Sequence, residues 1–358
     1  MKKKVCFYIS SHGFGHFARD IIIINSLLEN GFSVTAKSLI DFKYFKQRIP
    51  KTTRKFEYLK AGYDAGCIQK NFIDLDIPQT IKEIKKIIRS NYLNFESEKK
   101  YLENSKTDLV ISDAASFPLF CAKAMNIPSI LLTNFTWYDI YSRFPDISCI
   151  SEELKIIKDE YRCADIQYFP GVATPNNYVT NQENIGFISA SGKSMKNKLK
   201  KKYGLGNKKI CFIYFGSASN DSIQWRNLNK IEDYYFITHD RIKTKFCDNI
   251  IKADDDLLYA DLIASSDVVA TKVGYSTLAL CLRMRKPFIF CGRKYFYEYK
   301  FLKKKAESCG IGLKVSDASF YACRWKKYLD RQLISKIDLS GIEFNGERTL
   351  LKKCLIPE

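Results

Sequence analysis

The sequence lacks the marks of a membrane-spanning, secreted or zinc-binding protein. No apolar run reaches the roughly 18 residues that a membrane-spanning helix needs. The basic start is followed by a short apolar stretch without a cleavage site, so we expect no secretory signal. The 12 cysteines are scattered and form no C-x-x-C pair, which is typical of reduced, buried thiols rather than of disulfides or zinc ligands. No D-x-D pair stands at a convincing strand end, and we therefore expect no metal site.

What the chain has in excess is positive charge. Lys and Arg number 58 against 39 Asp and Glu, which gives a formal net charge of +19 and a pI near 9.3. Such an excess is typical of proteins with an anionic partner: nucleic acid, an anionic membrane surface or phosphorylated substrates. A lysine-rich composition inherited from an AT-rich genome would produce the same excess, and the sequence favours neither explanation. With 358 residues, the chain is long enough for two domains.

The N-terminal stretch predicts a strand, a glycine loop, a helix and a second strand. Residues 5–9 are apolar and rich in β-branched and aromatic side chains, as in a buried strand. Gly13 and Gly15 allow a sharp turn after this strand. Further on, apolar residues recur at helical spacing until Asn30 and Gly31, a typical helix end. Because ligands of open α/β sheets bind at the carboxyl ends of strands, we expect a site at this loop.

Two histidines flank the glycine loop, in the order His12-Gly-Phe-Gly-His16. The loop departs from the dinucleotide fingerprint G-x-G-x-x-G, because Ala18 stands at the third glycine position. The histidines either cap the helix or include a general base, since a helix N-terminus favours the neutral imidazole. Residues 108–113 predict a neighbouring strand that ends in Asp113. A histidine and an aspartate at adjacent strand ends suit the activation of a hydroxyl, although Asp113 could instead cap a helix.

The second half of the chain repeats the pattern of a strand followed by a loop of small residues. A polar, basic strip at residues 189–202 is expected to link two domains. Residues 209–215 then predict a buried strand that ends at Gly216 and Ser217, where backbone amides suit a diphosphate. A lysine and three small residues lead into a later helix, and such a helix N-terminus is an anion site. These four residues are Lys272, Gly274, Ser276 and Thr277.

Four parts of the chain resemble, in the same order, the glycosyltransferase-like domain of plant L-arabinokinases and their bacterial relatives. The loop at residues 12–19 resembles the opening S-G-H-G-F-G-H-A-T-R of that group. The other parts are Asp64-Ala-Gly-Cys-Ile-Gln69 with Asp74 and Thr80, residues 108–113 with 133–137, and residues 272–277 with 286–288 and 293–298. The matches extend from residue 5 to about residue 302, and their common order is more specific than any one of them.

This resemblance implies an α/β protein of the wider GT-B class, with two Rossmann-like domains facing each other across a cleft. We expect residues 1–190 to form the acceptor-binding domain, residues 203–340 the nucleotide-sugar-binding domain and residues 341–358 a tail. The implied activity is transfer of a hexosyl or pentosyl unit from a nucleotide sugar to an acceptor hydroxyl. The nucleotide sugar is a co-substrate, and no cofactor or metal is expected. A single displacement would invert the anomeric centre.

The resemblance also implies roles for single residues. His16 corresponds to the base of inverting GT-B enzymes and Asp113 to the residue that orients it, whereas His12 is either an alternative base or an acceptor ligand. Two sets of residues complete the expected sites. The donor set is Gly216, Ser217, Lys272, Gly274, Ser276, Thr277, Arg293 and Glu298. The acceptor or loop set is His12, Gly13, Gly15, Arg19 and Asn134.

The chain departs from the family pattern in two respects. Leu280 stands where many enzymes of this group carry a glutamate that holds the donor ribose. The lysine-rich residues after the last match hold no kinase motif, so we expect no kinase activity. The acceptor is either a lipid-linked glycan at a membrane or a modified base in nucleic acid. We expect a cytoplasmic enzyme without a stable protein partner, and attachment to the inner membrane face stays open.

Two other classes of function stay open as well. A non-enzymatic binder of nucleic acid or of an anionic membrane would use the same positive charge. Such a binder would not need His16 beside Asp113, and no nucleic-acid-binding module is recognisable in the sequence. A nucleotide-sugar epimerase or hydrolase could use the same fold. It would need an acidic pair around the sugar, and Glu298 alone does not supply one.

Overall fold

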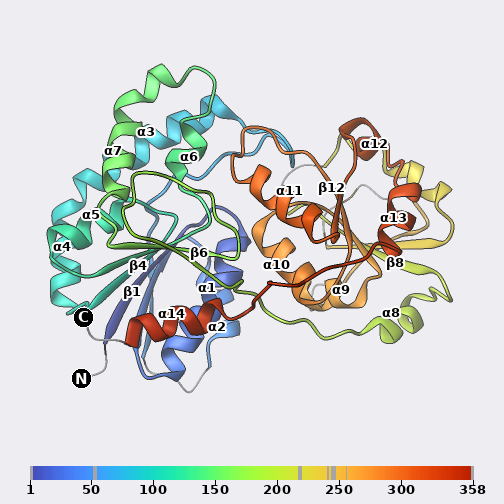
Figure 1. The fold of residues 1–358 in the computed structure, drawn as a ribbon, viewed down its shortest axis with the longest axis horizontal. Coiled ribbons are helices and arrows are strands. Elements are labelled where there is room, and N and C mark those ends of the chain that lie inside the picture. The colour runs from blue at the N-terminus through green and yellow to red at the C-terminus, as the bar shows by residue number, and fades with distance from the viewer. Residues whose placement is uncertain are drawn as a thin grey trace. The chain divides into compact units, whose positions relative to one another are not determined.

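The computed structural model describes residues 3–50, 55–216, 220–239, 242, 247–254 and 256–355. The chain divides into two α/β units, which Figure 1 shows in ribbon form. Unit 1 comprises Met1–Ile68, Asp76–Ile188 and Ile342–Glu358, and unit 2 comprises Gln69–Leu75 and Ser189–Gly341.

Unit 1 is built on a parallel sheet, which has seven strands within the described residues. The strands lie in the order β3-β2-β1-β4-β5-β6-β7. Their bounds are Lys4–Ile9 for β1, Ser33–Ser38 for β2, Phe56–Lys60 for β3, Leu109–Asp113 for β4, Ser129–Leu132 for β5, Ile166–Pro170 for β6 and Gln182–Ile185 for β7. The helices are α1 (Phe14–Glu29), α2 (Phe42–Arg48), α3 (Ile77–Leu93), α4 (Phe95–Asn104), α5 (Phe117–Ala124), α6 (Trp137–Tyr141), α7 (Ser151–Tyr161) and α14 (Gly346–Leu355).

Helices cover both faces of this sheet, as parallel strands require. Successive residues of β1 point to opposite faces, because the side chains of a strand alternate. Val5, Phe7 and Ile9 belong to the core cluster that α1, α2 and α14 complete, whereas Cys6 and Tyr8 belong to the cluster of α4 and α5. In Figure 1, α1, α2 and α14 accordingly lie together on one side of the sheet.

Unit 2 is built on a second parallel sheet, with six strands in the described part of the chain and the order β10-β9-β8-β11-β12-β13. The strands are β8 (Lys209–Tyr214), β9 (Tyr234–Thr238), β10 (Ile250–Lys252), β11 (Val268–Lys272), β12 (Phe288–Cys291) and β13 (Gly312–Lys314). The helices are α8 (Lys196–Tyr203), α9 (Tyr259–Ser265), α10 (Tyr275–Arg283), α11 (Tyr299–Ser308), α12 (Asp317–Tyr321) and α13 (Lys326–Leu333).

In each sheet the strand order reverses at one point. This point lies between β1 and β4 in unit 1 and between β8 and β11 in unit 2. The crevice outside the carboxyl ends of two such strands is where ligands bind in open α/β sheets. We therefore expect functional side chains in the loops that follow β1, β4, β8 and β11.

The structure has strands where residues 5–9, 108–113 and 209–215 predict them, and it adds strands that were not expected, such as β10 and β13. Three of its helices also differ from the expectation. The helix after the glycine loop begins at Phe14, so that Gly15 already lies in its first turn and Gly13 is its N-cap. The second part of the predicted linker forms α8 and belongs to unit 2. The predicted tail holds α14, which packs on α1 and belongs to unit 1. Short polar segments of this kind are placed by their tertiary partners rather than by their own apolar pattern.

Two simple expectations can be compared with the structure directly. In the described part of the chain, no helix has the length and apolar character needed to cross a bilayer. All 12 cysteines are free thiols, and all except Cys149 and Cys163 are buried. The prediction of buried, unpaired thiols thus holds for ten of the twelve positions.

Replacement of Leu350 by alanine is expected to lower the free energy of unfolding by about 2–5 kcal/mol, because it removes a buried side chain and leaves a cavity. Leu350 is fully buried in α14, whereas Leu355 on the same helix is 50% exposed. The control Leu355→Ala should therefore change the free energy of unfolding by less than about 0.5 kcal/mol. Chemical denaturation followed by circular dichroism measures both values. Equal effects of the two substitutions would show that α14 does not belong to the core of unit 1.

Candidate functional site

The carboxyl ends of β1 and β4 bring His16 and Asp113 together in unit 1. The two strands pair in parallel, with Ile9 opposite Asp113. Gly13, at φ 82°, turns the chain from β1 into α1, and this turn places His16 in the first turn of that helix. His16 Nδ1 lies 2.7 Å from Asp113 Oδ2. The side chain of Asp113 is fully buried, and that of His16 keeps 12% of its surface exposed.

This hydrogen bond selects one tautomer of the His16 ring. Asp113 Oδ2 is a carboxylate acceptor, so His16 Nδ1 donates its proton to it. In the neutral ring, Nε2 then carries the lone pair and can accept a proton from a hydroxyl. Asp113 does not cap the following helix, since α5 has Ser116 as its N-cap. The dyad therefore has the protonation pattern that a general base needs.

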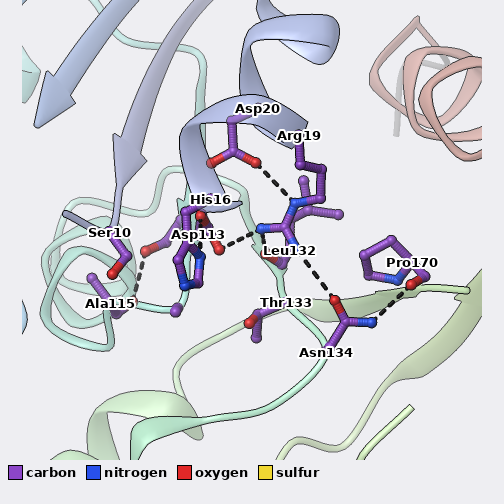
Figure 2. Close-up of polar contacts among 12 residues, drawn as sticks. Ser10, His16, Arg19, Asp20, Asp113, Ala115, Leu132, Thr133, Asn134 and Pro170 are labelled. Carbon is purple, nitrogen blue, oxygen red and sulfur yellow. Dashed lines mark hydrogen bonds and ion pairs between the residues drawn. The ribbon is translucent and has the colours of Figure 1, made fainter. Parts of the chain in front are cut away.

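Arg19 holds the second oxygen of the Asp113 carboxylate. Its Nη2 donates to Asp113 Oδ1 and, at 3.1 Å, to the Leu132 carbonyl. Its Nε donates to Asp20 Oδ1 at 3.0 Å. Figure 2 shows the guanidinium lying between these carboxylates, with Asn134 at its far end. Both oxygens of Asp113 are thus bonded, which fixes the plane of the carboxylate and, through it, the His16 ring.

Arg19 and Asn134, both in the acceptor or loop set predicted from the sequence, are buried. They keep 4% and 1% of their surface exposed. Asn134 Oδ1 accepts from Arg19 Nη1 at 3.4 Å, and its Nδ2 donates to the carbonyls of Pro170, at 2.7 Å, and Val172. The described contacts therefore place this pair behind the dyad, where it ties the ends of β5 and β6 to α1.

A second carboxyl group, that of Asp20, lies beside the same guanidinium. Asp20 is fully buried, and in its protonated form its carboxyl can donate a hydrogen bond to the Asp113 carboxylate. Burial, and then the nearby charge of Asp113, raise the pKa of Asp20 well above its ordinary value. Burial also raises the pKa of Asp113, and the Arg19 guanidinium opposes that shift. The charge of Arg19 therefore opposes the effect of burial on Asp113, whereas burial and the neighbouring Asp113 charge both favour the protonated form of Asp20.

In His12, the other histidine of the loop, Nδ1 accepts a hydrogen bond instead of donating one. Its Nδ1 accepts a hydrogen bond from the Cys67 amide at 3.1 Å, so a neutral His12 carries its proton on Nε2. Its ring also lies edge-on to Trp137, with 5.2 Å between the ring centres. Trp137 Nε1 in turn donates to Asp64 Oδ2 at 2.7 Å. His12 Nε2 is therefore a hydrogen-bond donor, which favours His16 over His12 as the base.

The segment against His12 leaves no room for a side chain at Gly66. A Cβ atom there would lie 2.6 Å from His12 Nδ1, and the backbone has φ +61°. Gly13 and Gly15 are exposed beside this pair of histidines. Gly13 and Gly15 have no side chain that would keep a ligand away from the loop.

Unit 2 places most of the expected donor residues around the reversal between β8 and β11. Lys272 ends β11, and its Nζ lies 3.8 Å from where a Cβ of Gly216 would stand, at the end of β8. Gly274 is the N-cap of α10 and has Ser276 in the first turn after it. Thr277 is buried and shares a hydrogen bond of 2.8 Å with Tyr259, so its hydroxyl is used within the protein. Lys272 and the N-terminus of α10 thus form one positive edge.

Of the remaining expected donor residues, two follow β12 in the sequence and one lies outside the described residues. Arg293 lies over the Phe296 ring, 3.8 Å from its centre. Glu298 is the N-cap of α11 and keeps 4% of its surface exposed. Leu280 is buried in α10, where a ribose-binding carboxylate is expected from the family pattern. Ser217 lies outside the described residues.

Three residues that contact these sites were not among the site residues predicted from the sequence. Asp20 lies inside α1, and nothing in the apolar pattern distinguishes it from a surface residue. Asp64 and Gln69 belong to the D-x-G-x-x-Q segment, which marks them only as part of a resemblance. The tertiary contacts give these residues their place: Asp20 on Arg19, Asp64 on Trp137 and Gln69 on Lys272.

The substitution Asp20→Asn is expected to remove a pH dependence of stability. Because the pKa of Asp20 is raised in the folded protein, the folded state keeps a proton that the unfolded chain releases above about pH 4. The free energy of unfolding of the native chain should therefore fall, relative to Asp20→Asn, as the pH rises from about 4 towards the folded-state pKa. Urea denaturation at a series of pH values measures this difference.

The exposed Asp146 provides the matched control, because Asp146→Asn makes the same chemical change in a carboxyl that faces solvent. The difference in free energy of unfolding between Asp146→Asn and the native chain should not grow in this way as the pH rises. A constant difference between Asp20→Asn and the native chain would show that Asp20 is ionised in the folded protein.

Comparison with known proteins gives one curated relative and many solved structures. No family model matches the chain. The L-arabinokinase of Arabidopsis thaliana is 24% identical over 350 residues. The alignment covers 95% of this chain and 33% of that protein, so the chain spans about a third of the length of its relative.

The solved structures resemble the chain over almost all of its length. The spinosyn forosaminyltransferase SpnP has a TM-score of 0.64 at 12% identity, covering 99% of this chain and 94% of that one. UGT2 of Phytolacca americana, solved with UDP-2fluoro-glucose and pterostilbene, has a TM-score of 0.64 at 14% identity, covering 99% and 98%. SnogD from Streptomyces nogalater has a TM-score of 0.62 at 12% identity, covering 99% and 100%. TM-scores of this size over nearly the whole chain establish a common fold despite the low sequence identity, and the chain therefore has the two-domain GT-B fold of these glycosyltransferases.

Proposed function

We propose that the chain is a glycosyltransferase, which moves a sugar from a nucleotide sugar to an acceptor hydroxyl with inversion of the anomeric centre. The observation that carries this proposal is the 2.7 Å bond between His16 Nδ1 and Asp113 Oδ2. This bond leaves a proton-accepting Nε2 at the carboxyl edge of a parallel sheet. Arg19 supports it from behind, so the base is oriented before any substrate arrives.

The first half of the chemistry is activation of the acceptor in unit 1. His16 Nε2 takes the proton of the acceptor hydroxyl, and Asp113 stabilises the imidazolium that forms. His12 Nε2, which carries a proton, suits a hydrogen bond to an acceptor oxygen. The two histidines would thus take complementary parts, one accepting a proton and the other donating a hydrogen bond.

The second half is departure of the nucleoside diphosphate in unit 2. As the acceptor oxygen bonds to the anomeric carbon, the bond from that carbon to the diphosphate oxygen breaks, and the diphosphate leaves with the electron pair. Lys272 and the N-terminus of α10 supply positive charge and backbone amides for this oxygen. The proposal therefore needs no divalent cation. A single displacement from the opposite face gives inversion.

The comparisons support the general kind of reaction. The solved neighbours named above are glycosyltransferases, and one of them holds a UDP-sugar analogue together with a second small molecule. An epimerase or hydrolase would need an acidic pair around the sugar, and the predicted donor set contains one carboxylate, that of Glu298. The His16 and Asp113 dyad, by contrast, suits deprotonation of an acceptor hydroxyl.

The substitution Asp113→Asn is expected to abolish most transfer while leaving donor binding unchanged. Arg19 requires an oxygen, so the amide nitrogen of the substituted side chain would face His16 and donate to its Nδ1. His16 would then carry its proton on Nε2 and could no longer act as a base. We expect a loss of about 10²–10⁴-fold in the rate of transfer, similar to that of His16→Ala.

Release of nucleoside diphosphate from a panel of nucleotide sugars, with mixed acceptors, measures this rate. Donor binding to the same variants, measured by calorimetry, is the control for folding. Full activity of both variants would contradict the proposed base. Release of diphosphate without any acceptor would instead identify a hydrolase.

The substitution Lys272→Ala is expected to weaken the binding of nucleoside diphosphates by roughly 10–100-fold, the range for losing a hydrogen bond to a charged group. The control is Lys201→Ala, which removes the same charge from an exposed position on α8, the helix that precedes β8. Titration of both variants with UDP, ADP, GDP and CDP measures the effect. Equal binding by Lys272→Ala and Lys201→Ala would show that the diphosphate does not bind at the end of β11.

A further inference from the structure

A short segment from the first half of the sequence forms part of unit 2. Residues Gln69–Leu75 stand in the sequence between two stretches of unit 1, but their contacts assign them to unit 2. The segment is a tight hairpin, with Gln69 and Leu75 paired in antiparallel fashion. Asn71 Oδ1 accepts the amides of Ile73 and Asp74, both at 2.8 Å, which closes the turn.

Two anchors hold this hairpin to unit 2. Phe72 is 1% exposed in an aromatic cluster, where its ring centre lies 4.8 Å from that of Phe215 and 5.6 Å from that of Tyr321. Asp74 Oδ1 lies 3.2 Å from Lys294 Nζ, and the Lys294 amide donates to the carbonyl of Ile73 at 3.3 Å. A buried aromatic ring and a paired charge fix the hairpin in one place.

The hairpin carries a polar side chain to the proposed donor site. Gln69 Oε1 accepts a hydrogen bond from Lys272 Nζ at 3.1 Å. Lys272 ends β11, beside the turn at Gly216 that follows β8. The amide of Gln69 therefore contacts the ammonium group that we expect to bind the diphosphate.

We propose that Gln69 is a positioning residue of the donor site, which orients the Lys272 ammonium for the diphosphate of the nucleotide sugar. This inference rests on the proposed function and adds to it a residue from a segment far away in the sequence. Gln69 acts through Lys272, and the hairpin anchors decide where its amide lies.

The chemistry of the side chain explains why an amide suits this position. A carboxylate in the same place would pair with Lys272 and compete with the diphosphate for its charge. An amide oxygen accepts the hydrogen bond without carrying a negative charge that would neutralise the ammonium. Methionine has the same length but only a weakly accepting thioether sulfur, so it would leave the flexible lysine stem less restrained.

The test is a comparison of Gln69→Met and Gln69→Glu, each in the native chain and in the Lys272→Ala background. Calorimetric titration with UDP, ADP, GDP and CDP, and with the matching nucleosides, gives the dissociation constants. For the diphosphates, we expect the dissociation constant to rise severalfold in Gln69→Met and about tenfold in Gln69→Glu. For the nucleosides, we expect the dissociation constant to stay unchanged. In the Lys272→Ala background, Gln69→Met should cause no further loss, because the two residues act as one unit.

Lys70→Gln is the matched control, because it lowers the net charge by one, as Gln69→Glu does, at an exposed neighbour in the same hairpin. It should bind diphosphates like the native chain. Thermal unfolding of every variant checks that the hairpin still folds.

The possible failures are distinguishable. If Lys272→Ala weakens binding but both Gln69 variants bind like the native chain, the role of Gln69 is wrong and the proposed function stands. If Gln69→Met weakens binding equally in both backgrounds, Gln69 does not act through Lys272. If Lys272→Ala itself has no effect, the proposed donor site is wrong, and the role of Gln69 is wrong with it.

Discussion

The buried carboxylate of Asp113 is the group around which the polar contacts of unit 1 are arranged, because a charge without solvent must be paired. One of its oxygens is bonded by His16 and the other by Arg19. Arg19 has further donors, and these reach Asp20, the Leu132 carbonyl and Asn134. Pairing one buried charge therefore joins α1 to the ends of β4 and β5 and, through Asn134, to the end of β6. The orientation of the His16 ring follows from that pairing.

The two units have the same sheet geometry, but the candidate residues at its edge include a carboxylate in unit 1 and a lysine in unit 2. Each has a parallel sheet whose strand order reverses once, and each gathers its candidate residues outside that reversal. Unit 1 places a carboxylate and imidazoles there, which suit the handling of a proton. Unit 2 places Lys272 and the start of α10 there, which suit an anion. A hydroxyl to be deprotonated and a diphosphate to be released need these two different environments.

Apolar patterning predicted the strands well, because a buried parallel strand is a short, nearly continuous apolar run. The pairing of His16 with Asp113 could also be predicted from the sequence, since the carboxyl ends of neighbouring parallel strands lie at the same edge of a sheet. The start of α1 was harder to predict, because its N-cap residue is Gly13, which has no side chain that could mark a helix start. The positions of α8 and α14 depend on the surfaces they cover, and their polar sequences do not identify those surfaces.

The sequence by itself determined the two α/β halves, the edges where chemistry could occur and the residue types present there. These features depend on local periodicity and on chain direction, which the order of residues specifies directly. Only the tertiary structure decided which ring nitrogen of His12 and of His16 holds its proton, since that depends on the Cys67 amide for His12 and on the Asp113 carboxylate for His16. It also placed the hairpin of Gln69 in unit 2, because the burial of Phe72 joins residues that are more than a hundred positions apart in the sequence.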